Sequence, residues 1–332
     1  MKVVIPGGSG HVGTLLARAL VRNGHEVVVL SRRPQSTAWR MVEWDGEHRG
    51  AWTRELDGAD AVVNLAGLSV NCRYHAKNRA AIMDSRLRST RVVGEAIAGC
   101  TLPPRIWLQM STATIYAHRY DAANDEFTGI LGGDEPATPD TWRFSIDVAR
   151  RWEAEAATFS IQQTRQVLLR TAMVMCPDRG GVFDTLLRLV RYGLGGTCGN
   201  GRQYVSWIHE VDFVRAIDWL IDHDDLSGPV NLAAPNPLPN AEFMRLLRAA
   251  WGVRLGLPAS RSILELGTWL LRTESELILK SRRVVPGKLS AHGFKFQFAS
   301  WSQAAAELCR RWKLGGDDAR TIVSHRRHHA PS

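Results

Sequence analysis

The first thirteen residues constrain the fold of this chain more than any other segment. A short β-branched run at residues 1–6 leads directly into Gly7-Gly8-Ser9-Gly10-His11-Val12-Gly13. A strand that opens through spaced glycines into a helix is typical of a dinucleotide-binding site, because Gly7 permits the tight turn and Gly10 lets backbone N–H groups approach a pyrophosphate. Gly13 lets the helix pack closely on the strand. The sequence therefore predicts a dinucleotide held by Gly7, Gly10, His11, Val12 and Gly13.

The residues that follow supply the context that such a loop needs. A helical pattern covers residues 12–23, and residues 26–30 form a second buried strand. The end of this strand selects the cofactor, because NAD sites carry an Asp or Glu there for the ribose 2′-hydroxyl. Here the strand ends in Ser31-Arg32-Arg33, whose guanidinium groups can hydrogen-bond a 2′-phosphate. We therefore expect NADP(H), although a solvated loop pair is the alternative interpretation of Arg32 and Arg33.

Composition bounds the class of protein. The chain has 332 residues, of which 45% are hydrophobic and 23% charged, and this suits a globular protein with two lobes. A strand at the very start leaves no room for a signal peptide, and no apolar run approaches the roughly 18 residues of a membrane span. The five cysteines lack the paired spacing of a zinc or redox site. We expect a cytoplasmic protein with free thiols, no metal and no membrane association.

The formal net charge of +9 raises the question of an anionic partner. Much of the basic excess is scattered, and one cluster at residues 324–329 lies in a basic tail predicted at residues 316–332. A positive surface also steers an anionic cofactor or substrate toward its site. We therefore expect a small-molecule substrate, with an anionic one as an option, and no nucleic-acid partner. A homodimer is compatible with the sequence.

Strand–helix alternation continues beyond the second strand. Further apolar strands are predicted at residues 60–67, 105–110 and 166–170, with helices at about 77–98 and 146–159. This alternation indicates an α/β fold, a Rossmann doubly wound parallel sheet that binds ligands at the carboxyl ends of its strands. The small residues that end the third strand would let a cofactor lie against the backbone. They are Leu65, Ala66 and Gly67.

The rest of the chain predicts a smaller, discontinuous α/β substrate lobe. We place the NADP-binding domain at residues 1–175, joined by 205–232, and the substrate lobe at 176–204 and 233–315. A Trp-rich helix at 262–271 is expected in the lobe core, because it is too short to span a membrane. The glycine-rich stretch before residue 204 would form a lid or substrate wall. Its candidate substrate contacts are Arg202, which can hold a phosphate or carboxylate, and Gln203.

Ordered motifs along nearly the whole chain resemble a known family. The motifs Gly7-x-x-Gly10-x-x-Gly13, Asn64–Gly67, Ser111–Tyr116 and Trp207–Asp212 are similar to those of the extended short-chain dehydrogenase/reductases, in their epimerase/dehydratase branch. A second set resembles an atypical, sugar-nucleotide-epimerase-like subfamily: Trp44–Gly46, Asp84–Arg86, Gly199–Gln203, Ser206–His209 and Arg283–Pro286. This subfamily implies a short C-terminal domain of unknown function, here at about 284–311.

The resemblance implies a catalytic set that this chain only partly contains. Extended members use a Ser or Thr hydroxyl to polarise the substrate oxygen, matched here by Thr112 or its neighbour Ser111. They also use a Tyr-x-x-x-Lys, whose Tyr transfers the proton, and its positions fall at about Ser145 and Ala149. The usual proton donor is therefore missing. Tyr116, which matches a Tyr near the site in other members, is a candidate substitute or a structural phenol.

Other residues are better candidates for binding. Tyr74 lies in the loop after Gly67, where relatives border the substrate, and a packing role suits it better than proton transfer. The resemblance places Arg86 and Arg170 near the cofactor, with an exposed helical arginine as the alternative for Arg86. Asp45 follows a strand-like segment and would touch the adenine side, or would only form a turn. For His209, fixing the backbone together with Asp212 is favoured over catalysis.

Taken together, these features predict an NADP-dependent oxidoreductase or epimerase acting on a small polar or nucleotide-linked substrate. Thr112 or Ser111 would polarise the oxygen of the reacting carbon, and Tyr116, Tyr74 or water would move the proton. The alternative is a catalytically silent NADP(H)-binding protein that senses redox state or docks a partner. The missing Tyr and Lys favour this alternative. The intact glycine loop is compatible with both.

Overall fold

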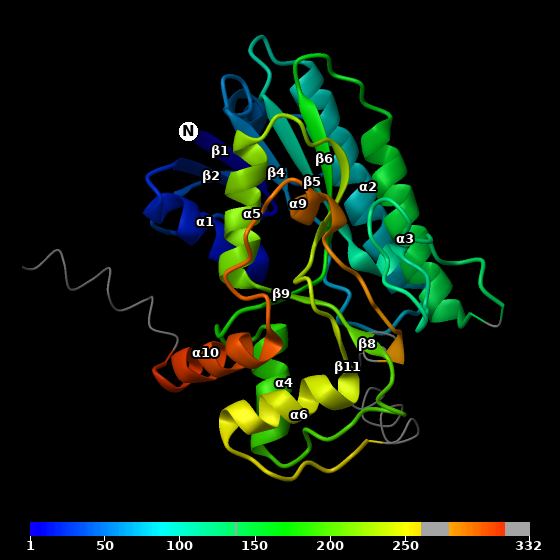
Figure 1. Ribbon diagram of the computed structural model, residues 1–332. Coiled ribbons are helices and arrows are strands. Elements are labelled where there is room, and N and C mark those ends of the chain that lie inside the picture. The colour runs from blue at the N-terminus through cyan, green and yellow to red at the C-terminus, as the bar shows by residue number, and fades with distance from the viewer. Residues whose placement is uncertain (137, 260–278, 316–332) are drawn as a thin grey trace, which may run out of the picture.

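The computed structural model describes residues 1–136, 138–259 and 279–315. Its larger part is built around a seven-stranded parallel sheet (Figure 1). The helix expected at 262–271 and the predicted tail at 316–332 lie outside these residues. The strand order is β10-β6-β5-β4-β1-β2-β3. The strands are β1 (Lys2–Pro6), β2 (Glu26–Ser31), β3 (Arg40–Glu43), β4 (Ala61–Asn64), β5 (Ile106–Thr112), β6 (Arg165–Thr171) and β10 (Gly228–Leu232).

Helices cover both faces of this sheet (Figure 1). Alternate residues of β1 show the division, because Val3 and Ile5 pack with α1 (His11–Arg22) and α5 (Glu210–Asp222), whereas Val4 packs with the helices of the other face. Those helices are α2 (Ala76–Ala98) and α3 (Asp140–Ala157). The predicted doubly wound α/β fold is confirmed. Helix α3 begins earlier than predicted, because Pro139 initiates it and an acidic residue follows in its first turn.

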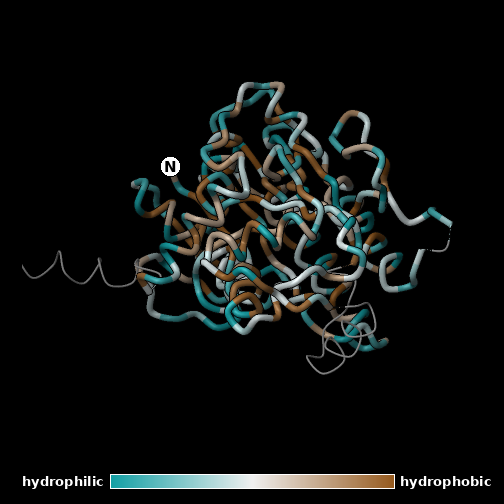
Figure 2. The backbone as a smooth tube through the Cα atoms, turned by 60° about the horizontal axis from the view of Figure 1, so that its bottom comes forward, coloured by the Kyte–Doolittle hydropathy of each residue, from teal (hydrophilic) through white to brown (hydrophobic). Residues whose placement is uncertain are grey.

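The hydrophobic core lies in the strands and under the helices. In Figure 2 the hydrophobic stretches concentrate in the interior, while the hydrophilic ones lie in peripheral loops. The central strands contribute residues that are fully buried, such as Ile5, Val29 and Leu108. Among the described residues, no helix has the length and hydropathy required to cross a membrane.

A smaller lobe packs below the carboxyl side of the sheet (Figure 1). Its core joins three helices, in which Phe243 stacks on Trp301 with ring centroids 4.0 Å apart. The helices are α4 (Val182–Arg191), α6 (Asn240–Trp251) and α10 (Trp301–Lys313). Two short ladders accompany them, one of β8 (Tyr204–Val205) with β11 (Leu238–Pro239) and one of β7 (Met173–Met175) with β9 (Trp207–His209).

One segment that we assigned to the substrate lobe packs instead on the sheet. Helix α9 (Gly287–Ala291) lies beside β10, and Leu289 and Phe294 belong to the core cluster of the cofactor domain. Their apolar side chains share this cluster with Val230 and Leu232 of the edge strand β10. The boundary between the two parts therefore crosses the region 284–296, which the sequence placed wholly in the lobe.

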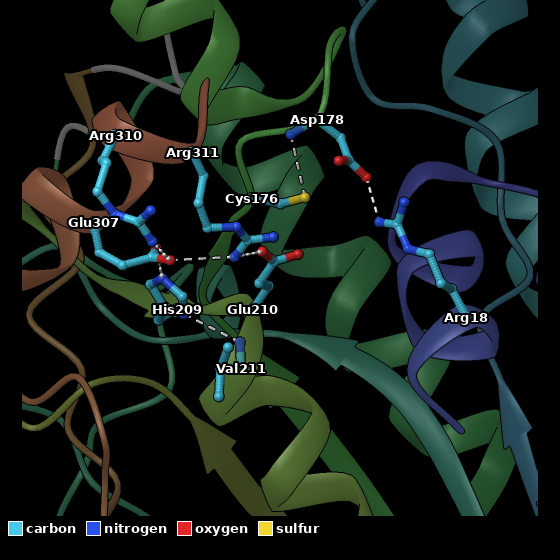
Figure 3. Close-up of polar contacts among 9 residues, drawn as sticks. All are labelled: Arg18, Cys176, Asp178, His209, Glu210, Val211, Glu307, Arg310 and Arg311. Carbon is cyan, nitrogen blue, oxygen red and sulfur yellow. Dashed lines mark hydrogen bonds and ion pairs between the residues drawn. The ribbon is translucent and has the colours of Figure 1, made fainter. Parts of the chain in front are cut away.

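Ion pairs and hydrogen bonds fasten the lobe to the cofactor domain (Figure 3). His209 is fully buried, accepts a hydrogen bond from Val211 N through Nδ1 and contacts Glu307 of α10 through Nε2 at 3.0 Å. Asp212 accepts the N–H groups of Gln297 and Phe298, both at 2.8 Å. These contacts agree with the expected role of His209 and Asp212 in fixing the backbone.

The same junction reaches the first helix. Arg18 of α1 forms an ion pair of 2.5 Å with Asp178, in the loop that leads from β7 to α4. Glu210, at the start of α5, pairs with Arg311 of α10 at 2.5 Å (Figure 3). The helix that carries the glycine loop is thus tied to the lobe that faces it.

Candidate functional site

The glycine loop has the geometry that its sequence predicts. Gly7 has a positive φ of 73°, and a Cβ there would lie 2.5 Å from Ala66 Cα, so that only glycine lets β1 and β4 end this close together. A Cβ on Gly13 would lie 2.5 Å from Gly8 Cα. A Cβ on Gly10, in contrast, would meet only Gly7 O at 3.8 Å. The space next to Gly10 is therefore open to a ligand.

Helix α1 starts at this loop without a cap. Gly10 is its N-cap residue and provides no side-chain hydrogen bond, so the first N–H groups of the helix, at His11, Val12 and Gly13, are available to an anion. His11 Nε2 is buried without a hydrogen-bond partner among the described residues. It packs so closely on Gly181 that a Cβ added there would lie 2.5 Å from it. An uncapped helix start with an unsatisfied imidazole fits a pyrophosphate.

A hollow of about 500 Å³ opens at the carboxyl ends of β2 and β3. Its floor contains Trp44 and Trp52, which meet edge to face at 5.3 Å, and Trp52 belongs to the short 3-10 helix η1 (Ala51–Glu55). The lining residues are Arg32, Glu43, Trp44, Asp45, His48, Arg49, Gly50, Ala51 and Trp52. Aromatic rings with polar groups around them suit an adenosine group.

Charges in this hollow differ in how they are paired. Asp45 accepts the N–H groups of Glu47 and His48 and contacts His48 Nδ1 at 2.7 Å. Desolvation acts against ionisation of this carboxyl, but those hydrogen bonds prevail and lower the pKa of Asp45 to about 2. Arg32 and Arg33 are exposed, while Ser31 is buried and its hydroxyl accepts Arg33 N. Ser31 therefore shapes the turn that presents the two arginines.

Arg86 of α2 reaches toward the residues that follow β4, where we expected a cofactor contact. Its side chain packs on Gly67, whose Cβ would be 3.3 Å from Arg86 Cζ, and its guanidinium lies 5.0 Å from the ring of Trp152. Its Nη1 donates to Ile82 O at 3.0 Å, and no carboxylate pairs with it in the described part of the chain. Burial lowers the pKa of Arg86 to about 10. A desolvated cation without a carboxylate fits an anionic ligand.

The backbone next to Gly67 also has the form that a close ligand requires. Leu65 N donates to Pro6 O at 2.9 Å, and Ala66 N to Asn64 Oδ1 at 3.1 Å. These bonds hold the end of β4 against the glycine loop. Leu65 and Ala66 thus position Gly67 at the sheet edge through their main chain.

The two neighbouring hydroxyls at the end of β5 differ in their partners. Ser111 is 3% exposed and donates to Glu153 Oε1 at 2.6 Å. Thr112 is half-buried, and its Oγ1 accepts the N–H of Thr114 at 3.2 Å. Within the described residues, no acceptor takes the hydroxyl proton of Thr112. The Ser111 hydroxyl is thus committed to Glu153, whereas that of Thr112 still has a proton to donate; the catalytic role expected of either residue stays a prediction.

Tyr116 and Arg170 belong to the same internal network and not to an open site. Arg170 forms two bonds with Glu153, of 2.9 and 2.7 Å, and donates a third to Tyr116 Oη at 3.0 Å. Tyr116 is 2% exposed and its hydroxyl donates to Asn231 Oδ1 at 3.0 Å. Burial raises the pKa of Tyr116 against the opposing effect of Arg170. These contacts agree with the interpretation of Tyr116 as a structural phenol, and they bond the guanidinium of Arg170 inside the protein; a catalytic Tyr116 and a cofactor contact of Arg170 stay predictions.

The helix that should carry Tyr-x-x-x-Lys offers no replacement for it. Ala149 is fully buried, against Ala113 and Tyr116. Tyr74 is 7% exposed and meets the ring of Phe144 edge to face at 5.1 Å. This packing agrees with the packing interpretation of Tyr74, and its contact with a substrate stays a prediction.

Of the two residues expected to contact the substrate from the glycine-rich stretch of the lobe, one has an exposed side chain. Arg202 is exposed, and its guanidinium lies 5.8 Å from the ring of Tyr120. Gln203 is 2% exposed and donates to Cys198 O at 2.9 Å, so it supports the glycine-rich loop from within. Arg202 remains available for a substrate contact. A substrate contact of Gln203 stays a prediction.

Sequence reasoning missed several residues of the site. Glu153 accepts from both Ser111 and Arg170, and its place four residues after Ala149 was a signal for a shared helix face. Glu43 and His48 enter the hollow through tertiary packing, for which the sequence carries no pattern. Lys280 and Arg282 reach the turn after β5 from a distant segment.

Comparisons with known proteins cover both parts of the molecule. The model of the NAD dependent epimerase/dehydratase family matches residues 3–233, and that of a domain of unknown function (DUF1731) matches residues 261–308. The human epimerase family protein SDR39U1 is 30% identical over 311 residues, which are 93% of this chain and 99% of the human one. The Mycobacterium leprae epimerase family protein ML0860 is 32% identical over 312 residues, 93% and 96% of the two chains.

A solved structure agrees with this pattern. The crystal structure of human SDR39U1 (isoform 2) with NADPH has a TM-score of 0.81 and 29% sequence identity to this chain. The match covers 93% of this chain and 99% of the human one. The likeness thus includes the sheet, the glycine loop and the lobe.

Proposed function

Since the chain belongs to the NAD dependent epimerase/dehydratase family, we propose that it is an NADP(H)-dependent oxidoreductase or epimerase. Its substrate is a small polar or nucleotide-linked molecule that reacts at a carbon bearing oxygen. The observation that carries this proposal is the hydroxyl of Thr112, whose proton has no acceptor among the described residues. It lies at the sheet edge that the open glycine loop shares, since β5, β4 and β1 are neighbours.

The residues present fit NADP(H). The open space at Gly10 and the uncapped start of α1 suit the pyrophosphate, and the hollow beside Trp44 suits the adenosine. Arg32 lines that hollow and supplies positive charge for a 2′-phosphate. The relative SDR39U1 crystallised with NADPH supports the same choice. When bound, the nicotinamide exchanges hydride with the reacting carbon.

Carboxylates in the hollow limit how strongly NADP(H) is preferred. Asp45 is held by His48 and by two backbone N–H groups, so its charge is largely compensated. Glu43 lines the hollow with Arg32 and would repel a 2′-phosphate nearby. The strength of the preference for NADP(H) over NAD(H) therefore depends on the attraction from Arg32 and Arg33 minus the repulsion from Glu43.

Arg86 supplies the remaining fixed charge of the site. The Arg86 cation beside Gly67 stabilises a phosphate or the ribose end of the cofactor. It supplies a positive charge that the family motif takes from a Lys, whose position here is the buried Ala149. Thr112 donates a hydrogen bond to the substrate oxygen and polarises it, and water supplies or removes the single proton that accompanies hydride transfer. This assignment follows from the burial of Tyr116 and Tyr74.

The rival function is a catalytically silent NADP(H)-binding protein. The buried Ala149 in the place of a Lys, without a phenol on the same helix face, favours it. The two functions share every cofactor contact. They differ only in whether Thr112 acts on a substrate.

Oxidation of NADPH across a panel of carbonyl compounds and nucleotide sugars tests this point. An enzyme turns over at least one of them, and Thr112→Val then lowers kcat by about 10²-fold with little change in NADPH affinity. Ser111→Ala is the matched control, because its hydroxyl is committed to Glu153, and it should affect stability more than kcat. A panel without turnover, on protein that binds NADPH, favours the silent function. Turnover that survives Thr112→Val refutes the assigned role.

A further inference from the structure

Two loops of the smaller lobe lie side by side and leave large apolar side chains in solvent. The first, residues 192–196, follows α4, and the second, residues 252–259, follows α6. Leu257 joins them, because its N–H donates to Gly193 O at 2.7 Å and its carbonyl accepts Gly196 N at 3.2 Å. Together the loops present four side chains that we call the apolar face: Tyr192, Leu194, Leu255 and Leu257.

The side chains of the apolar face stand out from the surface. Leu255 is 84% exposed, Tyr192 76% and Leu257 67%, whereas a side chain that lines a groove is largely covered by its walls. In Figure 1 the loop after α6 runs along the edge of the lobe that lies farthest from the sheet. Covering apolar side chains is favourable, so a group of them at one place on the surface indicates a partner.

Positive charges lie next to the apolar face. The guanidinium of Arg191, at the end of α4, lies 4.5 Å from the ring of Trp312 and 5.7 Å from that of Trp251. Lys313, the last residue of α10, has its Nζ 4.5 Å from the ring of Trp251. Arg254, within the second loop, is exposed as well, and none of the three cations has an ion pair with a carboxylate of the described residues.

The carboxylates of the lobe do not neutralise these cations, because each already has a basic partner. The pairs are Asp178 with Arg18, Asp184 with Arg188, Glu242 with Arg245 and Glu307 with Arg311. This part of the lobe therefore combines exposed apolar side chains with positive charge that the lobe itself leaves uncompensated.

We propose that this part of the lobe docks on an anionic lipid surface, where the apolar face enters the interface and the neighbouring cations meet the headgroups. Tyr and Trp rings are typical of the membrane interface, because one end of each is apolar and the other polar. Arg and Lys lay their stems along apolar surface and keep the charged end at the headgroups. The inference is independent of the proposed function.

Two other occupants fit this surface less well. A peptide partner requires a groove or an open sheet edge for its own side chains, whereas protruding side chains suit a fluid interface. A second copy bound about a two-fold axis would bring the same cations together, so charge opposes it.

The expectation of no membrane association considered only segments that could span a bilayer. Docking at the interface needs no span, and the apolar face forms only where the loops after α4 and α6 meet. The sequence continues beyond Lys313 into the predicted basic tail, whose cluster at residues 324–329 contains two further arginines.

Co-sedimentation of the full chain with lipid vesicles tests the proposal. The probes are vesicles of phosphatidylcholine alone and vesicles that also contain phosphatidylglycerol. We expect binding to the anionic vesicles to be about tenfold or more tighter, and to weaken as salt is raised. The double change Leu255→Ser with Leu257→Ser should weaken it by about tenfold or more. Arg254→Gln should weaken it by about fivefold and leave binding to neutral vesicles unchanged.

Leu102→Ser and Arg105→Gln are the matched controls. Leu102 is 67% exposed, as Leu257 is, and Arg105 is an exposed cation directly before β5, so both lie at the amino edge of the sheet, away from the lobe. Vesicle binding should stay within about twofold in both variants. Equal losses in the control and lobe variants overturn the proposal, because they indicate attraction by the net charge of the whole chain.

NADPH affinity should be unchanged in all these variants, and this shows that they fold. If the double variant does not fold, Leu255→Ser alone takes its place, at the most exposed of the four positions.

Light scattering identifies a second copy as the occupant. A dimer that the double leucine variant converts to a monomer assigns the apolar face to an interface between copies and overturns the proposal. Unmodified protein that binds neither kind of vesicle also overturns it, and leaves another protein or residues 260–278 of this chain as the cover.

Discussion

Glu153 of α3 and Arg170 of β6 form a two-bonded ion pair, with Nε to Oε1 at 2.9 Å and Nη2 to Oε2 at 2.7 Å. Their side chains are 11% and 8% exposed. The pair also binds the hydroxyls of Ser111 and Tyr116. Three residues that the sequence offers as site residues are therefore parts of one internal scaffold. Thr112 lies outside this network, and its Oγ1 accepts the N–H of Thr114.

Removing one partner of this pair should destabilise the protein strongly. Arg170→Met leaves the carboxylate of Glu153 buried and unpaired, so we expect the free energy of unfolding to fall by about 3–5 kcal/mol. Urea unfolding followed by circular dichroism measures it. Arg151→Met is the control, because its ion pair with Asp147 is exposed and should contribute less than about 1 kcal/mol. Similar losses in both variants contradict the scaffold role.

The cofactor preference should depend on residues at the ends of β2 and β3. The unmodified protein should bind NADPH more tightly than NADH by about 1–3 kcal/mol, and the double change Arg32→Ala with Arg33→Ala should remove most of this difference. Glu43→Gln should increase it, since one repulsive charge leaves the hollow. Fluorescence titration with both cofactors measures the three effects. Equal affinity of the unmodified protein for NADPH and NADH rules out the assignment.

Two glycines of the loop should respond differently to substitution. Gly10→Val places a branched side chain in the open space, so NADPH binding should be lost while the fold survives. Gly13→Ala forces a Cβ to within 2.5 Å of Gly8 Cα, so stability should fall by about 1–3 kcal/mol. Thermal unfolding and NADPH titration of both variants distinguish the two effects. A Gly10→Val variant with normal NADPH affinity would show that the phosphates bind elsewhere.

The buried carboxylate of Asp184 should make the lobe sensitive to acid. Desolvation acts to raise its pKa, but the N–H groups of Gly180 and Trp312 and the charge of Arg188 prevail, and the folded-state pKa is lowered. A lowered folded-state pKa gives stability that is present above the unfolded value of about 3.9 and is lost as pH falls through the folded value. Asp184→Asn should therefore cost about 1–3 kcal/mol at pH 7, and this difference should shrink below about pH 4.

Urea unfolding at several pH values measures this prediction. Asp147→Asn is the control, because Asp147 is an exposed acid on α3 with an exposed ion pair. Its effect should be small and nearly independent of pH. A difference between Asp184→Asn and the unmodified protein that persists unchanged into acid contradicts the assigned linkage.

The sequence predicts the cofactor domain well because its signals are local. Val3 and Ile5 mark a buried strand within five residues, and the spacing of Gly7, Gly10 and Gly13 dictates a turn that few other sequences can form. The two arginines after β2 are likewise a local feature, since the residues that distinguish NAD from NADP in this fold follow the end of one strand. Such features need no knowledge of what packs across the sheet.

Hydrogen-bond partners, in contrast, are decided only when distant segments meet. Nothing in the local sequence of Ser111 and Thr112 tells them apart, and only the approach of Glu153 from α3 commits the first hydroxyl and leaves the second. Arg282 lies 168 residues after Thr114, and no periodic pattern relates them. The sequence by itself therefore determined the succession of strands and helices and the form of the glycine loop. Tertiary structure decided which polar groups are used up inside the fold and which remain for a ligand, because a buried group is satisfied by whatever neighbour the packing brings to it.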